Sequence, residues 1–558
     1  MTMVSKFVFH NPSDGWRKLI SKLICSVAIS PSLIFGLQPI VLAESGQNKQ
    51  SQLLDLIQED VVNDDKQQQQ LELFFDPQSD FKITKDIEGD RLTPITIATG
   101  KNWLANNPNY DNLTGTNYRT PTKIVNSNHP KEEAEKSHSQ LQTMAGISGN
   151  PAASNMLVGT GDLGRWLGLD ENSPFRLGGV FMGNVSQQIS GGNQPGSTDF
   201  NGALILGLGI DLEKAVGWKN AFFEVEGLQY NGQPVNFAAG SVQGYNSVEA
   251  GPPLNRTELY QLWLNQTFLD NRLSFRVGKL IPSMNFGYVG RPFVTQTNPQ
   301  LFTSTTGLIY TPAFVGPAML GFIPGYYNSA FGLYGSWKSW GGPGDNPATP
   351  NGWYAQAGIY DGRGAQGVQT GLVWPNFSGP LFKVAEVGGT WTPYADAPEI
   401  GWGSVAVGGW RQSGPLTAPG GAFETQTGGI YGYLVQKLGK FRDSEDQNGI
   451  VGFVQGGWNS SNTALIHSSL GFGLTFIAPF GDRPLDSYGF GFSWARLNAN
   501  PLAGYGFNSY ETMVQFYAQY HLVGNLFIQP VLTVLPTPGS VGASGPSVSG
   551  TVQLTFPF

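Results

Sequence analysis

The sequence has one cysteine, few charged residues and no long apolar run after its first 43 residues. Charged side chains make up 13% of the 558 residues. That is about half the share usual in a globular protein. The mean hydropathy is nonetheless slightly polar, at -0.16. This combination argues against a helical membrane protein, in which every span is a run of about 20 apolar residues. It favours strands in which apolar and polar residues alternate.

Residues 1–43 are predicted to be a secretory signal peptide. Three basic residues precede a mainly apolar stretch, 23–42, and Ala43 provides a small residue for cleavage. The alternative is a retained helical anchor, which Pro31 and Pro39 disfavour because they break the segment. Cys25 lies inside it. The mature chain would therefore contain no cysteine and would need neither disulfides nor thiolate chemistry.

Residues 44–150 differ in composition from the rest of the chain. They contain acidic clusters and a glutamine tract, 67–70. We predict a low-complexity, flexible or partly helical periplasmic extension, and a short amphipathic helix that binds a partner is the alternative to solvated disorder. The whole chain has 32 basic and 40 acidic residues. This balance argues against a nucleic-acid partner.

Residues 151–558 are predicted to form an all-β domain, a transmembrane antiparallel β-barrel of about 16 strands. Its last strand has an apolar face made of Val552, Leu554, Phe556 and Phe558. The opposite face is mostly polar, as required of a strand with lipid on one side and a wet lumen on the other. The terminal Phe558 also resembles the C-terminal signal read by the outer-membrane insertion machinery, a predicted partner.

The same alternation and the spacing of turns predict the other strands. They are expected over residues 175–185, 204–212, 221–230, 256–268, 273–280, 329–339, 353–360, 381–394, 402–411, 425–437, 449–458, 468–478, 487–497, 510–521, 526–535 and 547–558. Long loops alternate with short turns, and an even strand number leaves both ends of the domain on the periplasmic side. A barrel of about 16 strands encloses an aqueous channel.

No motif predicts an enzyme, a cofactor or a metal. Segments 159–164 and 362–367 match the dinucleotide glycine pattern, but neither lies between a strand and a helix as that site requires. The histidines lack metal-ligand spacing. A catalytic role for His467 or His521 as the base of a neighbouring serine is the alternative, but nothing supplies a third, orienting group. Polar lumen or loop histidines are the simpler interpretation.

Binding and passage of solutes remain as the function. Sugars present hydroxyl groups that need paired donors and acceptors, and C–H faces that pack on aromatic rings. Residues that could line such a pore lie on the predicted strands and are Glu224, Glu226, Arg256, Glu258 and Arg276. The alternative is that these charges only hold one another in place.

The longest predicted loop, from Pro282 to about 325, contributes three further candidates, Asn285, Tyr288 and Arg291. A third loop of this length is expected to bend into the lumen and to face Glu224, Glu226 or Glu258. The alternative is a cap on the barrel surface.

Several segments resemble one known family, the carbohydrate-selective porins of the OprB type. They are Asp211-Leu212-Glu213-Lys214 with Gly217-Trp218, residues 255–266, Arg276-Val277-Gly278-Lys279, residues 352–362, and Gly481-Asp482-Arg483-Pro484. The resemblance covers about 161–558. The family's usual Gly-Asp-Trp-Gly-Gly-Leu-Arg opening is altered here over 161–166, and residues 44–150 match no part of the family pattern.

The resemblance implies a passive outer-membrane channel for sugars and other small hydrophilic solutes, in contact with outer-membrane lipid. Porins of this size are usually trimers, so a homotrimer is considered. Two alternatives stay open at this point. One is a less selective porin for ions and small solutes. The other is an envelope-tethering protein in which the barrel is only an anchor and residues 44–150 bind the cell wall.

Overall fold

The structure is a computed structural model. It describes residues 161–170, 172–251, 254–287, 289–291, 303–324, 328–341, 350–363, 374–393, 401–417, 423–443, 448–498, 508–540 and 545–558. The predicted signal peptide and the predicted extension lie outside the described residues. Within these ranges no helix combines the length and the apolar character needed to cross a bilayer.

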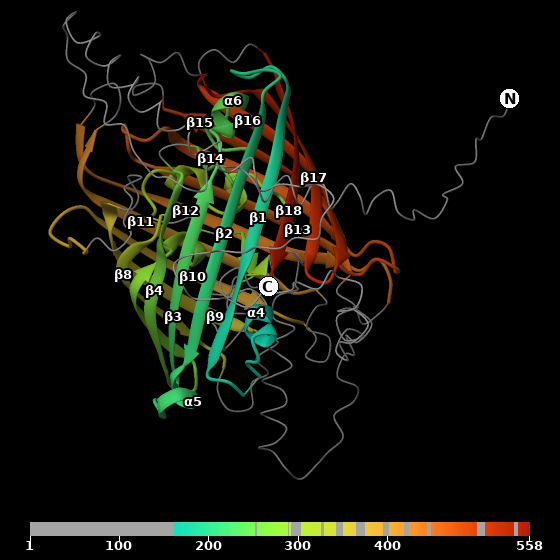
Figure 1. Cartoon of the computed structure of the whole chain (residues 1–558). Helices are drawn as coiled ribbons and strands as arrows, with labels where there is room; N and C mark the ends of the chain where they lie inside the picture. Colours follow the sequence, from blue (N-terminus) through green and yellow to red (C-terminus); the bar gives the residue numbers. More distant parts are fainter. Residues whose placement is uncertain are drawn as a thin grey trace, which may run out of the picture. The chain divides into compact units, whose positions relative to one another are not determined.

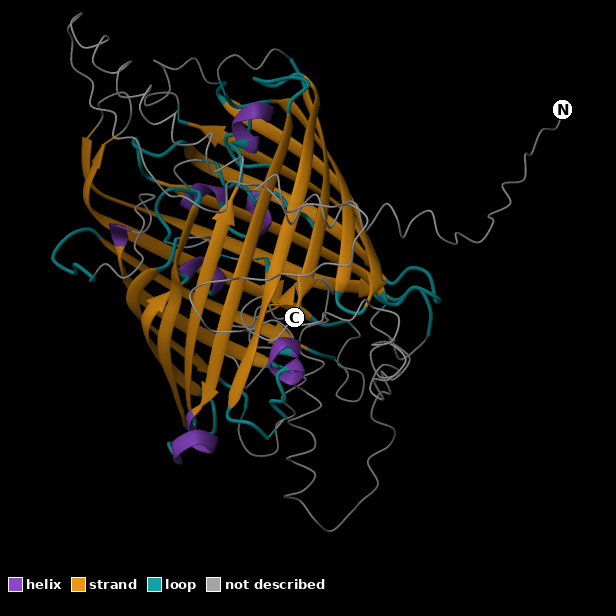
Figure 2. Ribbon diagram, in the orientation of Figure 1, coloured by secondary structure: helices purple, strands orange, loops and turns teal. Residues whose placement is uncertain are grey.

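Sixteen antiparallel strands form one closed barrel, which confirms the predicted fold class (Figures 1 and 2). Each strand pairs with the next one in this order, and the last pairs with the first. The strands are β1 (Phe175–Ser190), β2 (Thr198–Asp211), β3 (Ala221–Asn231), β4 (Arg256–Phe268), β5 (Leu273–Leu280), β8 (Ala330–Lys338), β9 (Gly352–Asp361), β10 (Leu381–Trp391), β11 (Gly403–Thr417), β12 (Phe423–Gly439), β13 (Gly449–Asn459), β14 (Ile466–Ile477), β15 (Ser487–Leu497), β16 (Tyr510–Val523), β17 (Leu526–Thr537) and β18 (Ser547–Pro557).

The remaining described elements are short. They are the helices α4 (Asp162–Trp166), α5 (Leu212–Val216) and α6 (Val235–Ala239), the 3-10 turns η5 (Pro282–Met284), η6 (Thr311–Ala313) and η7 (Pro317–Met319), and a two-stranded sheet of β6 (Gly290–Arg291) and β7 (Thr303–Ser304).

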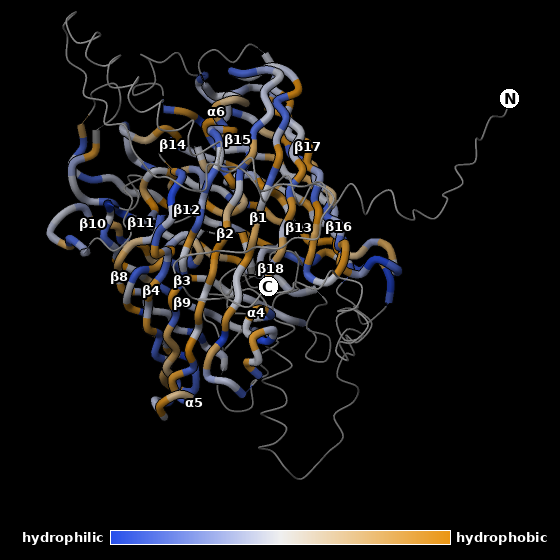
Figure 3. The backbone as a smooth tube through the Cα atoms, viewed as in Figure 1, coloured by the Kyte–Doolittle hydropathy of each residue, from blue (hydrophilic) through white to orange (hydrophobic). Residues whose placement is uncertain are grey.

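The barrel wall has an apolar outer face and a polar inner face. In β16, Phe516 on the outer face is 48% exposed, whereas the preceding residue, Gln515, is on the inner face and is fully buried. Exposed apolar side chains recur on the other strands, including Leu206, Val277, Leu333, Val387, Val407, Ile430, Leu470, Leu532 and Val552. Figure 3 shows apolar and polar residues mixed along the same strands. Apolar side chains outside and polar side chains inside are the arrangement that lipid around an aqueous lumen requires.

Short turns join the strands at one end of the barrel, here called the turn end, where β1 begins and β18 ends. The helix α5 makes one of these turns. Asp211 caps it by accepting hydrogen bonds from the backbone N–H groups of Glu213 and Lys214 at 3.0 and 3.1 Å. Gly217 then ends it with φ of 76°, a conformation that favours glycine. Longer connections leave the opposite end, here called the loop end.

The described parts of two of the longer connections lie inside the barrel. The long inward loop, residues 281–329, joins β5 to β8, and the second inward loop, residues 232–255, joins β3 to β4. Tyr245 of the second loop and Leu308 and Tyr310 of the first belong to one buried cluster with lumen-facing residues such as Tyr354 and Tyr517. The hydrophobic core therefore lies in the lumen, between these loops and the wall.

Phe558 closes the barrel beyond the end of β18. Its backbone N–H donates to the Gly179 carbonyl at 2.9 Å, and the Gly179 N–H donates to the Phe558 carbonyl at 2.8 Å. Its ring centroid lies 5.5 Å from that of Phe556. The last residue thus extends the pairing of β18 with β1.

Glu249 in the second inward loop is a partly buried carboxyl group. Burial raises its pKa to about 7, hydrogen bonding to Asn236 opposes the rise, and the charge of Asp199 adds to it. The hydroxyl group of Tyr230 also donates to the Glu249 backbone carbonyl. Protonation of this side chain is therefore linked to the packing of the loop.

Deleting Phe558 is predicted to lower the yield and the stability of the folded barrel. The two hydrogen bonds to Gly179 would be lost, which should cost about 1–3 kcal/mol of unfolding free energy. The measurement is the heat-dependent shift in electrophoretic mobility. F558A keeps the backbone and separates the contribution of the ring. Unchanged yield and midpoint in the deletion variant would show that β18 closes the barrel without its last residue.

The second inward loop is predicted to loosen as the pH rises. Glu249 binds its proton more tightly in the folded than in the unfolded chain, so the stability it contributes is present below its ordinary pKa of 4.5 and is lost as the pH rises through about 7. Amide hydrogen exchange of 241–251, corrected for the intrinsic rate, should therefore speed up across this range. E249Q should show no such change; an equal change in E249Q would assign it to another group.

Candidate functional site

Glu386 on β10 fixes the long inward loop near its start, at Gly287. It is 1% exposed and faces the lumen. Its Oε1 accepts hydrogen bonds from the Tyr354 hydroxyl at 2.9 Å and the Gln356 amide at 2.8 Å. Its Oε2 accepts from the Tyr431 hydroxyl at 2.9 Å and from the backbone N–H of Gly287 at 3.2 Å. One carboxylate thus joins the loop to β9, β10 and β12.

Side-chain amides on other strands hold the rest of this loop. They donate to its backbone carbonyls in four pairs, Gln356 to Asn285 at 2.6 Å, Gln529 to Gly307 at 2.5 Å, Gln455 to Pro312 at 2.5 Å and Asn459 to Ala318 at 2.9 Å. Irregular backbone at membrane depth is tolerated only where protein or water satisfies its polar groups. The lumen-facing amides supply these partners around much of the wall.

The second inward loop depends on Glu511 of β16. The Glu511 carboxylate accepts hydrogen bonds from the backbone N–H groups of Val242 at 2.6 Å, Gln243 at 3.1 Å and Gly539 at 3.0 Å. The Ser241 hydroxyl donates to it at 3.0 Å. This carboxylate therefore ties the loop both to β16 and to the connection that follows β17.

Gln515 of β16 joins the two inward loops. Its Oε1 accepts from the backbone N–H groups of Ile309 at 2.8 Å and Tyr310 at 3.2 Å, and its Nε2 donates to the Tyr245 carbonyl at 3.0 Å. Because the three partners lie on two different loops, neither loop is positioned alone.

Glycines make room for the tyrosines of this network. A Cβ added to Gly388 would overlap the ring of Tyr354, and one added to Gly408 would overlap the ring of Tyr431. Both glycines face the lumen on strands next to the tyrosine's own strand. The rings therefore lie flat across the wall, which brings both hydroxyl groups to Glu386.

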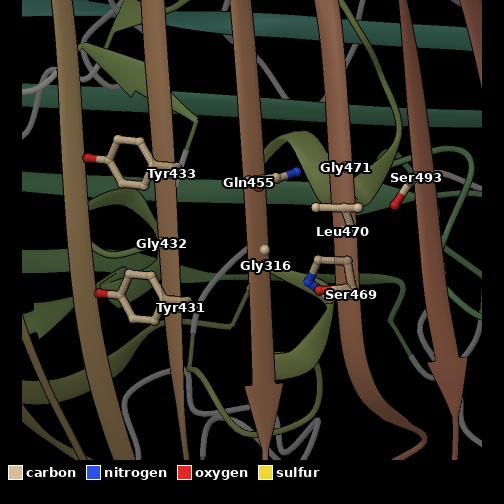
Figure 4. Close-up of a pocket in the computed structure, with 12 residues that line it drawn as sticks. Gly316, Tyr431, Gly432, Tyr433, Gln455, Ser469, Leu470, Gly471 and Ser493 are labelled. Atoms are coloured by element: carbon tan, nitrogen blue, oxygen red, sulfur yellow. The ribbon is translucent and has the colours of Figure 1, made fainter.

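A small cavity separates the long inward loop from the wall. Loop residues Gly287, Gly316 and Pro317 form one side. The other side consists of β12 to β15, through Tyr431, Gly432, Tyr433, Gln455, Gly456, Ser469, Leu470, Gly471 and Ser493. Figure 4 shows the hydroxyl groups of Tyr431 and Tyr433 pointing to the same side of β12. The Tyr433 hydroxyl lies 3.1 Å from that of Tyr354, so it extends the Glu386 network.

Three predicted site residues come together on the part of the wall formed by β3, β4 and β5. Glu224 and Glu226 on β3 are fully buried, and Gln261 of β4 donates to Glu226 at 2.5 Å. Arg276 of β5 interacts electrostatically with Glu224. Its guanidinium carbon lies 4.8 Å from the ring centroid of Trp263, within the range of a cation–π contact.

Tyr334 of β8 makes a second cation–π contact with Arg276, with 5.0 Å between the guanidinium carbon and the ring centroid. Arg276 is thus held between Trp263 and Tyr334 while two carboxylates lie across β4. This combination of planar cation, carboxylates and aromatic rings has the chemistry to pair hydroxyl groups and pack the C–H face of a solute. All of these side chains are at most 1% exposed, so a solute reaches them only when the inward loops move.

The predicted residues Arg256 and Glu258 form a separate ion pair, with 2.9 Å between Nε and Oε1. Arg256 also donates to the Leu254 carbonyl at 2.7 Å and to Asn328 Oδ1 at 3.0 Å. The guanidinium therefore holds β4 to the ends of both inward loops.

The loop candidates differ in what the structure describes. Asn285 is 1% exposed, and neither its Oδ1 nor its Nδ2 has a hydrogen-bond partner among the described residues. Tyr288 lies outside the described residues. Arg291 pairs with Thr303 through the backbone, and its side chain is outside the description. The acid to which the described part of the loop hydrogen-bonds is Glu386, not one of the three expected acids.

Sequence reasoning missed Glu386 and Glu511 as loop anchors, and Trp263 as the platform for Arg276. Glu386 did leave a signal, because it is the only charged residue on the lumen face of β10, whose other members are Phe382, Val384, Gly388 and Thr390. A lone acid between apolar and small neighbours on a buried face must have partners elsewhere.

Comparison with known proteins supports the barrel assignment. The model of the carbohydrate-selective porin, OprB family, matches residues 199–558. The high-pH structure of Pseudomonas putida OprB is similar with a TM-score of 0.55 and 16% identity, covering 69% of this chain and 94% of that one. Its low-pH structure gives 0.40 and 13%, covering 69% and 93%. Acinetobacter baumannii OccAB2 gives 0.35 and 9%, covering 68% and 97%.

No curated protein sequence matches this chain significantly. At 16% identity, the likeness to Pseudomonas putida OprB speaks for the fold alone. The family model, in contrast, spans well over half of the chain and covers every barrel strand from β2 to β18 almost entirely. It confirms the resemblance found in the sequence: the chain belongs to the OprB family of carbohydrate-selective porins.

Proposed function

We propose that this chain is a bacterial outer-membrane porin through which carbohydrates and other small hydrophilic solutes diffuse passively. Family membership and the closed barrel with an apolar outer face support this function. We further propose that Glu224, Glu226, Arg276 and Asn285 contact the solute where the inward loops narrow the lumen. Tyr288 and Arg291 are proposed to contribute from the same loop, and Arg256 and Glu258 to shape its ends.

The observation that carries the solute site is the position of Arg276 between Trp263 and Tyr334, with Glu224 nearby. The stacked rings limit the movement of the guanidinium, so it meets a hydroxyl group at little cost in side-chain entropy. Carboxylates accept from the same hydroxyl groups to which arginine donates. A pyranose could therefore replace its hydrogen bonds to water with hydrogen bonds to these side chains as it passes through the channel.

A less selective porin is the competing function within the same family. Charged residues on both sides of a lumen also attract ions, and the family match does not distinguish an ion path from a sugar site. The two differ in one observable, since only a sugar site gives a conductance that short sugars block.

Assembly and biogenesis are part of the proposal. We propose that the outer-membrane insertion machinery reads the strand that ends in Phe558, whose pairing with β1 closes the barrel. We also propose a homotrimer in the lipid bilayer. Cross-linking in native membranes measures the subunit number.

Replacing Arg276 is predicted to weaken sugar block. R276Q keeps a polar side chain but loses the charged guanidinium. Block of single-channel conductance by glucose or maltose should therefore weaken by about tenfold, which corresponds to the loss of one charge-assisted hydrogen bond. K383Q is the matched control, because it removes one positive charge from the outward face. Equal sugar block in R276Q and wild type would remove Arg276 from the site; no block in wild type would favour the ion porin.

Replacing Glu386 is predicted to free the long inward loop at Gly287. E386Q cannot accept all four hydrogen bonds, and unpaired buried donors should cost about 1–3 kcal/mol of local stability. Conductance should rise and become noisier, while the barrel still shows its heat-dependent mobility. E424Q is the control, because Glu424 accepts from Ser461 and Asn462 at the loop end. Wild-type conductance in E386Q would mean that another element sets the constriction.

A further inference from the structure

Two cationic residues lie side by side on the outward face of the barrel. Lys383 of β10 and Arg411 of β11 are direct partners in the antiparallel register, and both side chains are exposed. Their chain neighbours Val384 and Gln412 point to the lumen and are buried. The two charges, here called the cation pair, are therefore directed away from the channel.

The described part of the chain gives the cation pair no acidic partner. Residues directly opposite in a sheet have Cβ atoms about 4.5–5.5 Å apart, and like charges at such positions destabilise the strand pairing. Arg411 donates to the side-chain oxygen of Gln426, a neutral group on β12. Among the described residues, no acidic side chain forms an ion pair with Lys383 or Arg411. An arrangement that is unfavourable alone becomes favourable with an anion between the charges.

The cation pair lies just beyond the apolar band of the wall. On the same two strands, four residues nearer the turn end, Val387 and Val407 are direct partners with exposed fractions of 61% and 59%. At about 3.3 Å per residue, the outer face changes from apolar to doubly cationic within about 13 Å along the strand. The strands β10 and β11 are neighbours over this whole stretch.

Aromatic residues indicate that this is the level of the lipid headgroups. Trp374 and Phe377, in the connection that enters β10 from the loop end, are 83% and 50% exposed. Trp458 on β13 is 43% exposed. It pairs with Ile430 of β12, which in turn pairs with Gly409 of β11, two residues before Arg411. Exposed tryptophans concentrate at the membrane–water interface. The cation pair therefore lies where the phosphates of outer-leaflet lipids are found.

We propose that Lys383, Arg411 and Gln426 form a binding site for the phosphate of a lipid headgroup in the outer leaflet. The arginine fork donates to two phosphate oxygens, and the lysine ammonium adds a second charge from the facing strand. Gln426 orients the guanidinium through the hydrogen bond it accepts. The acyl chains of the lipid then extend along the exposed Val387 and Val407. This site is distinct from the channel and adds a lipid ligand to the proposed function.

Arg496 shows what distinguishes the cation pair from an isolated surface charge. It is also exposed on the outer face, near the loop end of β15, but its register partners are Ser468 and Tyr510. A single cation has no cross-strand repulsion for an anion to relieve. Arg496 therefore provides the matched control for charge and for membrane level.

The test uses the purified full-length protein in detergent with three probes: bisphosphorylated lipid A, the same lipid after enzymatic dephosphorylation, and inorganic phosphate. Native mass spectrometry measures bound lipid, and the heat-dependent mobility shift measures stability. Lipid A should bind and raise the midpoint in wild type and R496Q. K383Q and R411Q should each bind it about tenfold more weakly. The double variant K383Q/R411Q should show no stabilisation.

Without lipid, the variants are expected to be at least as stable as wild type, because K383Q and R411Q relieve the repulsion between the two cations. Their midpoints should equal or exceed that of wild type, which also shows that the variants fold. Conductance and sugar block should not change, so failure of the lipid site and failure of the sugar channel are separately visible.

Four results would overturn the proposal. They are undiminished lipid A binding in K383Q/R411Q, equal loss in R496Q, equal stabilisation by dephosphorylated lipid, and equal stabilisation by inorganic phosphate alone. The last would identify a site for the free ion. If K383Q/R411Q instead changed the subunit number without changing lipid binding, this face would be a contact between copies of the chain, and the lipid proposal would be wrong.

Discussion

The rest of this structure depends on one constraint, that the backbone polar groups of the inward loops must be hydrogen-bonded. Loop N–H and C=O groups inside a membrane barrel need partners, and the polar lumen face supplies them. Glu386 and Glu511 accept from backbone N–H groups of one loop each, and Gln515 contacts both loops. A lumen of apolar side chains would leave these groups unpaired, and the loops could not stay inside.

The same constraint separates two kinds of lumen residue. Glu386, Glu511 and the amide side chains use most of their hydrogen-bonding capacity on the loops, so they define the shape of the passage. Arg276 on β5 and Glu224 on β3 are held by aromatic contacts and charge instead, and Tyr334 beside Arg276 donates to Gln356 of the Glu386 network at 2.7 Å. The two kinds of residue are nevertheless coupled, because Gln356 contacts Tyr334 as well as Glu386.

Sequence patterns predicted all sixteen barrel strands, because alternation with a period of two is a local signal. Several boundaries were set too short. The prediction began the second strand at residue 204, whereas β2 begins at Thr198, and β11 continues to Thr417 instead of 411. At these ends the strands extend past the apolar band, where pairing continues but one face is no longer apolar. Of the site, Glu224, Glu226 and Arg276 were predicted, whereas the loop anchors were not.

The sequence by itself determined the two-faced strands, their number and order, and the long connection between the fifth and sixth of them, because each follows from residues adjacent in the chain. Only the tertiary structure decided that this connection hydrogen-bonds to Glu386 and that Lys383 faces Arg411. Gly287 and Glu386 are 99 residues apart, and no local pattern encodes a hydrogen bond over that separation. Such contacts depend on barrel closure, which sets the register and brings remote side chains to the same depth of the lumen.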